Sequence, residues 1–150
     1  MIHGADTGFL VAAEVAEHAS HEASRDTLAR LLSQGDVFAL APQVLSEFIH
    51  IVTDGRRFAQ PLAVATACTL AERWWLAKEV VQVFPDEAAT VQFLTWLQQF
   101  SLGRKRLLDT LLAATYFHAG IHSLITTNPT DFAVFGVFAC ITPLRAITPP

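Results

Sequence analysis

The stretch Ile2-His3-Gly4-Ala5-Asp6-Thr7-Gly8-Phe9-Leu10 shows the strand-then-helix order on which this chain is built. Residues 2–5 form a short apolar run, which predicts a buried strand ending at Asp6. Residues 7–14 predict a helix, with Asp6 or Thr7 as its cap. An acidic residue therefore lies at the junction between a strand and a helix.

The same order recurs along the rest of the chain. Gly35 and Gly120 are predicted to stop helices, Pro42 to begin one and Asp86 to cap one. Short strands that alternate with helices predict an α/β fold, with a mostly parallel sheet and helices on both faces. Further strands are predicted at 37–41, 80–84, 123–127 and 137–141, and helices at 21–34, 42–53, 62–77, 87–100, 104–118 and 132–135.

The composition limits the class of protein. Of the 150 residues, 52% are apolar and 16% are charged, which predicts one domain over residues 1–150 with a sizeable core. The chain has no apolar run of about 18 residues and no basic region at its start, so neither a membrane span nor a secretory signal is expected. Cys68 and Cys140 form no CxxC pair and indicate reduced thiols. A cytoplasmic protein is expected.

Acidic and amide residues occur in apolar surroundings at four places. Asp6 follows the first strand, Glu47 lies in an amphipathic helix, and Asp109 interrupts a leucine block. Asn128 and Asp131 share a turn after the fourth strand. Charged side chains are rarely buried unless they are paired or bind a metal. Because ligands of parallel sheets bind beyond the carboxyl ends of the strands, these residues predict one convergent site.

The side-chain chemistry of this set predicts its ligand. Carboxylate and amide oxygens, without a cluster of cysteine or histidine beside them, favour Mg²⁺ or Mn²⁺. Such ions promote phosphodiester hydrolysis by neutralising the phosphate and activating water. Thr7 and Thr127 are predicted to hydrogen-bond the acids or the phosphate, and the alternative is that they cap strand ends.

Each acidic residue also has a purely structural interpretation. Asp6 is a suitable helix N-cap, and Asp109 would complement the helix dipole if its helix began close to it. Glu47 fits a solvated helix edge, and Asn128 with Asp131 fits ordinary turn chemistry. Their common placement at strand ends and helix starts favours a site over four separate structural roles.

Basic residues gather in two clusters, although the net charge is −4. Arg104, Lys105 and Arg106 precede the leucine block, and Arg56 and Arg57 follow the amphipathic helix. Both clusters are predicted to hold an RNA backbone electrostatically. The alternative for the first cluster is a solvated helix start, where three positive charges would oppose the helix dipole.

Four segments together resemble the PIN-domain family, and within it the VapC-type toxin ribonucleases. They cover essentially the whole chain in order, and their combination is more specific than any one of them. The segments are Ala5-Asp6-Thr7-Gly8-Phe9-Leu10-Val11, Leu45-Ser46-Glu47-Phe48, Asp109-Thr110-Leu111-Leu112-Ala113-Ala114-Thr115 and Leu124-Ile125-Thr126-Thr127-Asn128-Pro129-Thr130-Asp131-Phe132.

The resemblance implies a three-layer α/β/α sandwich with the activity of a Mg²⁺- or Mn²⁺-dependent endoribonuclease, the toxin of a type II toxin–antitoxin pair. It implies that Asp6, Glu47 and Asp109 form the acidic site. Asn128 takes the fourth position, with Asp131 close by as a further metal ligand. It also implies an RNA substrate, a cognate antitoxin and a homodimer.

Two positions depart from the family pattern. Gly8 stands where the first motif usually has Asn or Ser, and Asn128 supplies an amide where an acid is also common. Both departures favour an alternative function, a non-catalytic PIN-like scaffold for RNA binding or assembly.

Three other features of the sequence have more than one interpretation. Asp6-Thr7-Gly8 matches the motif of aspartic proteases, but that fold is almost wholly β, whereas this chain is mostly helical. His18 and His21 have an HxxH spacing, which we interpret as part of a solvated segment. The helix at 62–77 is apolar on more than one face and carries Trp74-Trp75, which predicts a partner surface. The alternative is an internal core helix.

Overall fold

The computed structural model describes residues 1–143 and contains a five-stranded sheet in which each pair of neighbouring strands is parallel. The predicted α/β fold is confirmed. Residues 144–150 of the predicted domain lie outside the described part. The strand order is β3-β2-β1-β4-β5, with β1 (Ile2–Ala5), β2 (Val37–Leu40), β3 (Val80–Gln82), β4 (Ser123–Ile125) and β5 (Ala139–Ile141).

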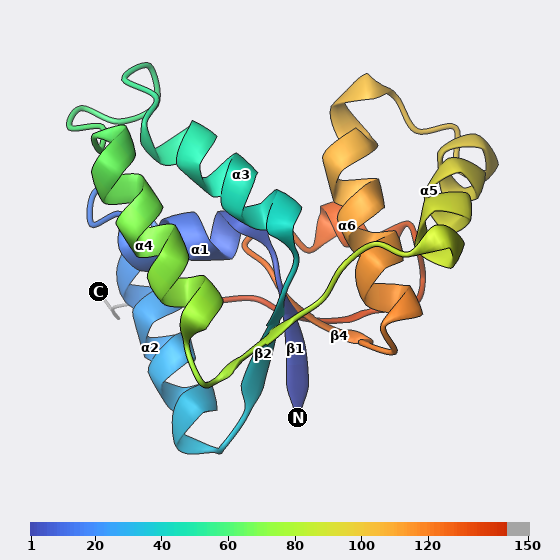
Figure 1. Cartoon of the computed structure of the whole chain (residues 1–150), viewed down its shortest axis with the longest axis horizontal. Coiled ribbons are helices and arrows are strands. Elements are labelled where there is room, and N and C mark those ends of the chain that lie inside the picture. Colours follow the sequence, from blue (N-terminus) through green and yellow to red (C-terminus); the bar gives the residue numbers. More distant parts are fainter. Residues whose placement is uncertain (144–150) are drawn as a thin grey trace, which may run out of the picture.

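Helices cover both faces of the sheet (Figure 1). The chain steps from β1 to β2 to β3 in one direction and then returns across the sheet to β4. Because such crossovers are right-handed, this reversal puts the later helices on the opposite face. One face carries α1 (Thr7–Glu14), α2 (His21–Ser33), α3 (Pro42–Val52) and α4 (Val64–Leu76), and the other carries α5 (Glu87–Gln99) and α6 (Leu107–His118).

The helix ends follow local sequence chemistry. Asp86 Oδ1 accepts a hydrogen bond from the Ala89 N–H (2.7 Å) at the start of α5. Gly35 and Gly120 take φ values of 80° and 76° just after α2 and α6, a conformation that glycine adopts readily. Pro42 is the first residue of α3. These predicted helix signals are confirmed.

Tyr116 of α6 fixes that helix to the centre of the sheet. Its side chain is fully buried, and its hydroxyl lies 2.6 Å from the Ala5 carbonyl and 3.0 Å from the Ala39 carbonyl. A Cβ on Gly4 would lie 2.6 Å from the Tyr116 ring, so glycine at this position leaves the room that the ring needs. The start of α6 is thereby positioned over the carboxyl edge of the sheet.

Several predicted boundaries were wrong. Residues 104–106 form a 3₁₀ turn, η1 (Arg104–Arg106), and α6 begins only at Leu107. The strand predicted at 123–127 ends at Ile125, because the Thr126 hydroxyl accepts the Asn128 N–H (3.0 Å) and turns the chain out of the sheet. The short helix predicted at 132–135 is α7 (Thr130–Ala133). No helix within residues 1–143 is long and apolar enough to cross a membrane.

Candidate active site

Asp6 lies at the carboxyl end of β1, beside the end of the neighbouring strand β4. Its backbone N–H donates to the Ile125 carbonyl (3.0 Å), and Thr126 Oγ1 donates to Asp6 Oδ2 (2.8 Å). The chain leaves β1 toward β2 and leaves β4 toward β5, so the strand order reverses between them. Ligands of open α/β sheets bind at such a reversal. The Asp6 side chain makes no capping hydrogen bond to α1.

Glu47 reaches the same region from α3, which follows β2 directly. Thr7 Oγ1 donates to Glu47 Oε2 (3.0 Å). Because Thr7 is the first residue of α1, this bond holds the Glu47 carboxylate beside the end of β1. The predicted contact between Thr7 and an acid is therefore present, in place of the alternative role in strand-end capping.

Asp109 approaches from the opposite face of the sheet, in the first turn of α6. Arg106 Nε lies 3.6 Å from Asp109 Oδ2, and the Arg106 guanidinium donates to the backbone carbonyl of Asp131. The sequence predicted Arg106 as an RNA contact, but its guanidinium is held by groups of the site itself. Arg104 and Lys105 are exposed on η1.

One cleft of about 490 Å³ unites these residues. The structure thus brings together acidic and amide side chains that are as many as 125 positions apart in sequence (131 − 6). The acidic, amide and hydroxyl residues that line it are Asp6, Glu47, Asp109, Thr127, Asn128 and Asp131, and the remaining lining is Gly8, Val11, His18, Ile51, Arg57 and Phe58.

The cleft disfavours the charged form of two of its carboxyl groups, Asp6 and Asp109. Burial raises the pKa of Asp6 to about 7, with added repulsion from Asp109 and Glu47, while the Thr126 hydrogen bond lowers it. Burial also raises the pKa of Asp109 to about 6, assisted by the charge of Asp131 and opposed by Arg106. Asp109 lies where the helix dipole would favour its charge.

The donor set fits a hard divalent cation. The carboxylates converge from both faces of the sheet and repel one another, and a cation would offset that repulsion. Within residues 1–143, however, no three His, Cys, Asp or Glu side chains form a group that is ready to hold a metal ion. That these carboxylates share a cation together with its waters stays a prediction.

Thr126, rather than Thr127, is the partner of Asp6. The sequence predicted both threonines within one strand, and side chains alternate between the two faces of a strand. The Thr127 hydroxyl instead faces α1, and a Cβ on Gly8 would lie 2.8 Å from Thr127 Oγ1. Gly8, which departs from the family pattern, therefore accommodates Thr127.

One wall of the cleft is not acidic. Arg57 and Phe58, from the connection between α3 and α4, line it together with His18, from the connection between α1 and α2. His18 is half-buried, whereas its neighbours Glu17 and Ala19 are exposed, as expected for a solvated segment. Arg56 does not line the cleft and pairs with Asp54, Nε to Oδ1 3.2 Å. Phe58 and His18 were missed because no local pattern reveals that two loops meet.

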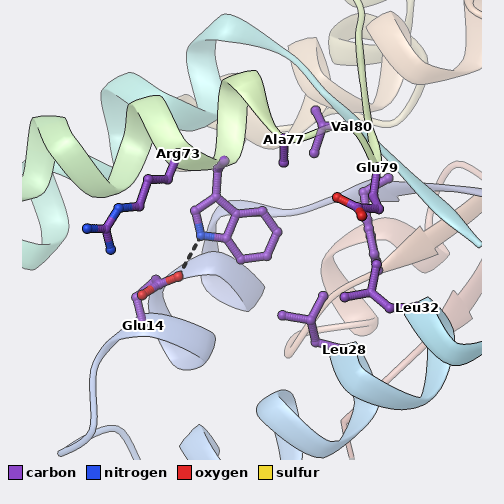
Figure 2. A pocket seen from close by; sticks show the side chains of 9 residues that line it. Glu14, Leu28, Leu32, Arg73, Ala77, Glu79 and Val80 are labelled. Atoms are coloured by element: carbon purple, nitrogen blue, oxygen red, sulfur yellow. Dashed lines mark hydrogen bonds between the residues drawn. The ribbon is translucent and has the colours of Figure 1, made fainter.

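A second hollow lies away from these acids, between α2, α4 and β3 (Figure 2). It has a volume of about 210 Å³, and Trp74 Nε1 donates to Glu14 Oε1 across it (2.8 Å). Trp74 is 9% exposed and packs against Phe9 at 6.3 Å between ring centroids. Trp74 is thus a core residue rather than an exposed partner residue.

Comparison with known proteins gives a family match and several similar structures. The family model described as PIN domain matches residues 5–136. Mycobacterium tuberculosis VapC20, described as a sarcin-ricin-loop-cleaving toxin, is similar with a TM-score of 0.73 and 21% identity over 95% of this chain and 100% of that one. VapBC2 from Rickettsia felis, bound to a promoter DNA fragment, gives 0.65 and 17% over 95% and 98%. VapBC-1 from nontypeable Haemophilus influenzae gives 0.64 and 17% over 95% and 98%. None of the curated proteins matches the chain.

Proposed function

The chain belongs to the PIN-domain family, and on this premise we propose that it is a Mg²⁺- or Mn²⁺-dependent endoribonuclease. The observation that carries the proposal is the single cleft into which Asp6, Glu47 and Asp109 converge from three distant segments. The raised pKa values of Asp6 and Asp109 fit a site that is completed by a cation. Residues 1–150 would form one domain that acts in the cytoplasm.

The proposed metal ligands are the oxygens of Asp6, Glu47, Asp109 and Asn128, with Asp131 as a further ligand. A bound cation would supply charge neutralisation at the phosphate and an activated water. Asn128 offers an amide oxygen without charge, so we expect it to contribute less than the acids.

The surrounding side chains orient this set. Thr126 holds one oxygen of Asp6, and Thr7 holds one oxygen of Glu47. Arg106 offsets part of the charge on Asp109. Such partners fix the direction of a ligand's lone pairs, and their loss commonly weakens metal binding. Arg104 and Lys105, exposed on η1 beside Arg106, would hold the RNA backbone.

We further propose that the protein is the toxin of a type II toxin–antitoxin pair, with a cognate antitoxin and a homodimeric state. Support comes from the likeness to VapC20 and to VapBC complexes along nearly the whole chain. At 17–21% identity, that likeness concerns the fold.

The direct test is cleavage of RNA with Mg²⁺ or Mn²⁺ against an EDTA control. Asp6→Asn, Glu47→Gln and Asp109→Asn should each reduce the rate by at least about 100-fold, since each removes a charge that holds the cation. Asp26→Asn, at an exposed position on α2, is the matched control and should leave the rate unchanged. Full cleavage in EDTA would rule the mechanism out.

A non-catalytic RNA-binding or assembly scaffold is the second candidate. The observation in its favour is the amide Asn128 in a cleft where an acid would bind a cation more strongly. Calorimetric titration with Mg²⁺, for the natural protein and for Asp6→Asn, distinguishes the two functions. Heat of binding that the substitution abolishes supports the enzyme, and no heat in either protein supports the scaffold.

A further inference from the structure

The non-acidic wall of the cleft is formed by two loops, and the side chain of Glu17 joins them. Glu17, in the connection between α1 and α2, accepts the Ala59 N–H at Oε1 (2.8 Å) and the Gln60 N–H at Oε2 (3.2 Å). Both carboxylate oxygens are thus used to hold the backbone of the connection between α3 and α4. Hydrogen bonds to an ionised acceptor are among the stronger ones in proteins.

The held loop is also closed at its base. The Leu62 N–H donates to the Val52 carbonyl (2.9 Å), and Asp54 Oδ1 accepts the Arg56 N–H (2.9 Å). The loop is therefore fixed at its base by α3 and along its side by Glu17. This arrangement keeps Arg57 and Phe58, which lie between the two attachments, at the cleft.

Arg57 and Phe58 together have the chemistry that single-stranded nucleic acid requires. The Arg57 side chain is 59% exposed, and its Nε lies 3.8 Å from Asp54 Oδ2, a weak pair that leaves the guanidinium able to bind a phosphate. The Phe58 ring is half-buried and lines the cleft, so it offers an apolar surface on which a base can stack. Arg56, its neighbour, has the same charge but does not line the cleft.

We propose that Arg57 and Phe58 grip the nucleotide next to the scissile phosphate of single-stranded RNA, and that Glu17 is the residue that positions them. This inference rests on the proposed function, because it takes RNA as the ligand of the acidic cleft. It assigns the acidic side of the cleft to the reacting phosphate and the opposite side to substrate recognition.

Binding of a fluorescein-labelled single-stranded RNA decamer in EDTA tests the wall without any cleavage. Arg57→Gln should weaken binding about tenfold and reduce the slope of log affinity against log salt by about 0.7, the loss of one phosphate contact. Arg56→Gln, in the same loop, should change the affinity by less than about twofold. Equal effects of the two substitutions would overturn the assignment.

Substitutions that keep or remove the aromatic ring test the role of Phe58. Phe58→Tyr keeps a ring and should bind the decamer as the natural protein does, whereas Phe58→Leu should bind about tenfold more weakly. Thermal unfolding of both variants identifies any loss of folded protein. Binding by a folded Phe58→Leu variant that matches the natural protein would exclude stacking.

Glu17 provides a test in which charge and position predict opposite results. Removing an acid near the cleft should strengthen RNA binding if charge alone acts. If Glu17 positions the wall, Glu17→Ala should instead raise KM for RNA cleavage about fivefold and leave kcat within about twofold. Glu72→Ala, an exposed acid on α4, is the control of equal charge. Tighter RNA binding by Glu17→Ala would overturn the positioning role.

The nuclease function and the RNA-binding role of Arg57 and Phe58 can be contradicted independently of each other. If the natural protein binds the decamer through Arg57 and Phe58 but cleaves no RNA with either metal, the RNA-binding role of these residues is supported and the nuclease function is contradicted. If it cleaves RNA and the variants at Arg57, Phe58 and Glu17 behave as the natural protein does, the nuclease function is supported and the RNA-binding role of these residues is contradicted.

Discussion

Burial distinguishes Asp6 from the other acids of the cleft. It is 7% exposed, and its only charged neighbours that act on its pKa are the carboxylates Asp109 and Glu47 within the described residues. The Thr126 hydroxyl is one of the few groups that favour its charged form. Stability is therefore lost at this residue whenever it ionises without a cation, a cost that the proposed function explains.

The pH dependence of folding should reveal this cost. The pKa of Asp6 rises from 3.8 to about 7 on folding, so the folded state binds more protons and stability falls as the pH rises from about 4 to about 7. Asp6→Asn should therefore stabilise the protein in EDTA at pH 8 by on the order of 2 kcal/mol and give no gain at pH 4. Urea unfolding at both pH values measures it. A variant that is less stable at pH 8 would contradict the assignment of burial as the cause.

Gly8 and Thr127 should behave as a coupled pair. Gly8→Ala would gain helix propensity of about 1 kcal/mol, but its Cβ would press on Thr127 Oγ1. The gain should be absent in the natural background and should appear once Thr127→Ala removes the hydroxyl. A double-mutant cycle of unfolding free energies measures the coupling. Additive effects would show that Gly8 has some reason other than Thr127.

At the scale of elements, α6 connects the core to the site. Its Tyr116 binds carbonyls of β1 and β2, and the same helix carries Asp109 in its first turn, seven positions before Tyr116 (116 − 109 = 7). The rigid docking of the helix over Gly4 thus determines where the Asp109 carboxylate stands.

Substitutions at this contact should therefore affect stability unequally. Tyr116→Phe removes only the hydroxyl and should cost about 1 kcal/mol of unfolding free energy. Gly4→Ala puts a Cβ 2.6 Å from the ring and should cost at least about 2 kcal/mol, because the close-packed core cannot yield. Chemical denaturation of each variant provides the comparison. A Gly4→Ala protein as stable as the natural one would show that the ring can move.

Element identity could be predicted from sequence because its signals are local. Asp86, Pro42 and Gly120 each act within one turn of their own position, and each was confirmed. The start of α6 was predicted three residues too early, because Arg104 to Arg106 are good helix formers and nothing local specifies a 3₁₀ turn.

The candidate site was predictable only in part, for a related reason. Carboxylates in apolar sequence at strand ends indicated the cleft that Asp6, Glu47 and Asp109 line. The partner of Asp6 was missed by one residue, since it depends on where β4 ends and which side of the chain Thr126 faces. The Glu17 contact joins loops 42 positions apart and has no local pattern at all.

At the scale of the whole molecule, exposed apolar side chains lie on several elements, and the arrangement on α4 differs from that on α5. On α4, the exposed large apolar side chains Val64 and Leu76 lie at opposite ends of the helix. On α5, Val91 and Leu94 are 59% and 51% exposed and one turn apart. A partner surface needs contiguous apolar area, which favours α5 over α4.

The oligomeric state tests whether α5 or α4 forms the partner surface. If the proposed homodimer forms through α5, Leu94→Glu should shift the protein from dimer to monomer at micromolar concentration, because a dimer interface cannot bury an unpaired charge without a cost of several kcal/mol. Leu76→Glu on α4 is the matched control, with a side chain that is 66% exposed. Equilibrium sedimentation of both variants, with circular dichroism to verify folding, provides the measurement. A dimer that survives Leu94→Glu and dissociates with Leu76→Glu would return the interface to α4, and a natural protein that sediments as a monomer would exclude both surfaces.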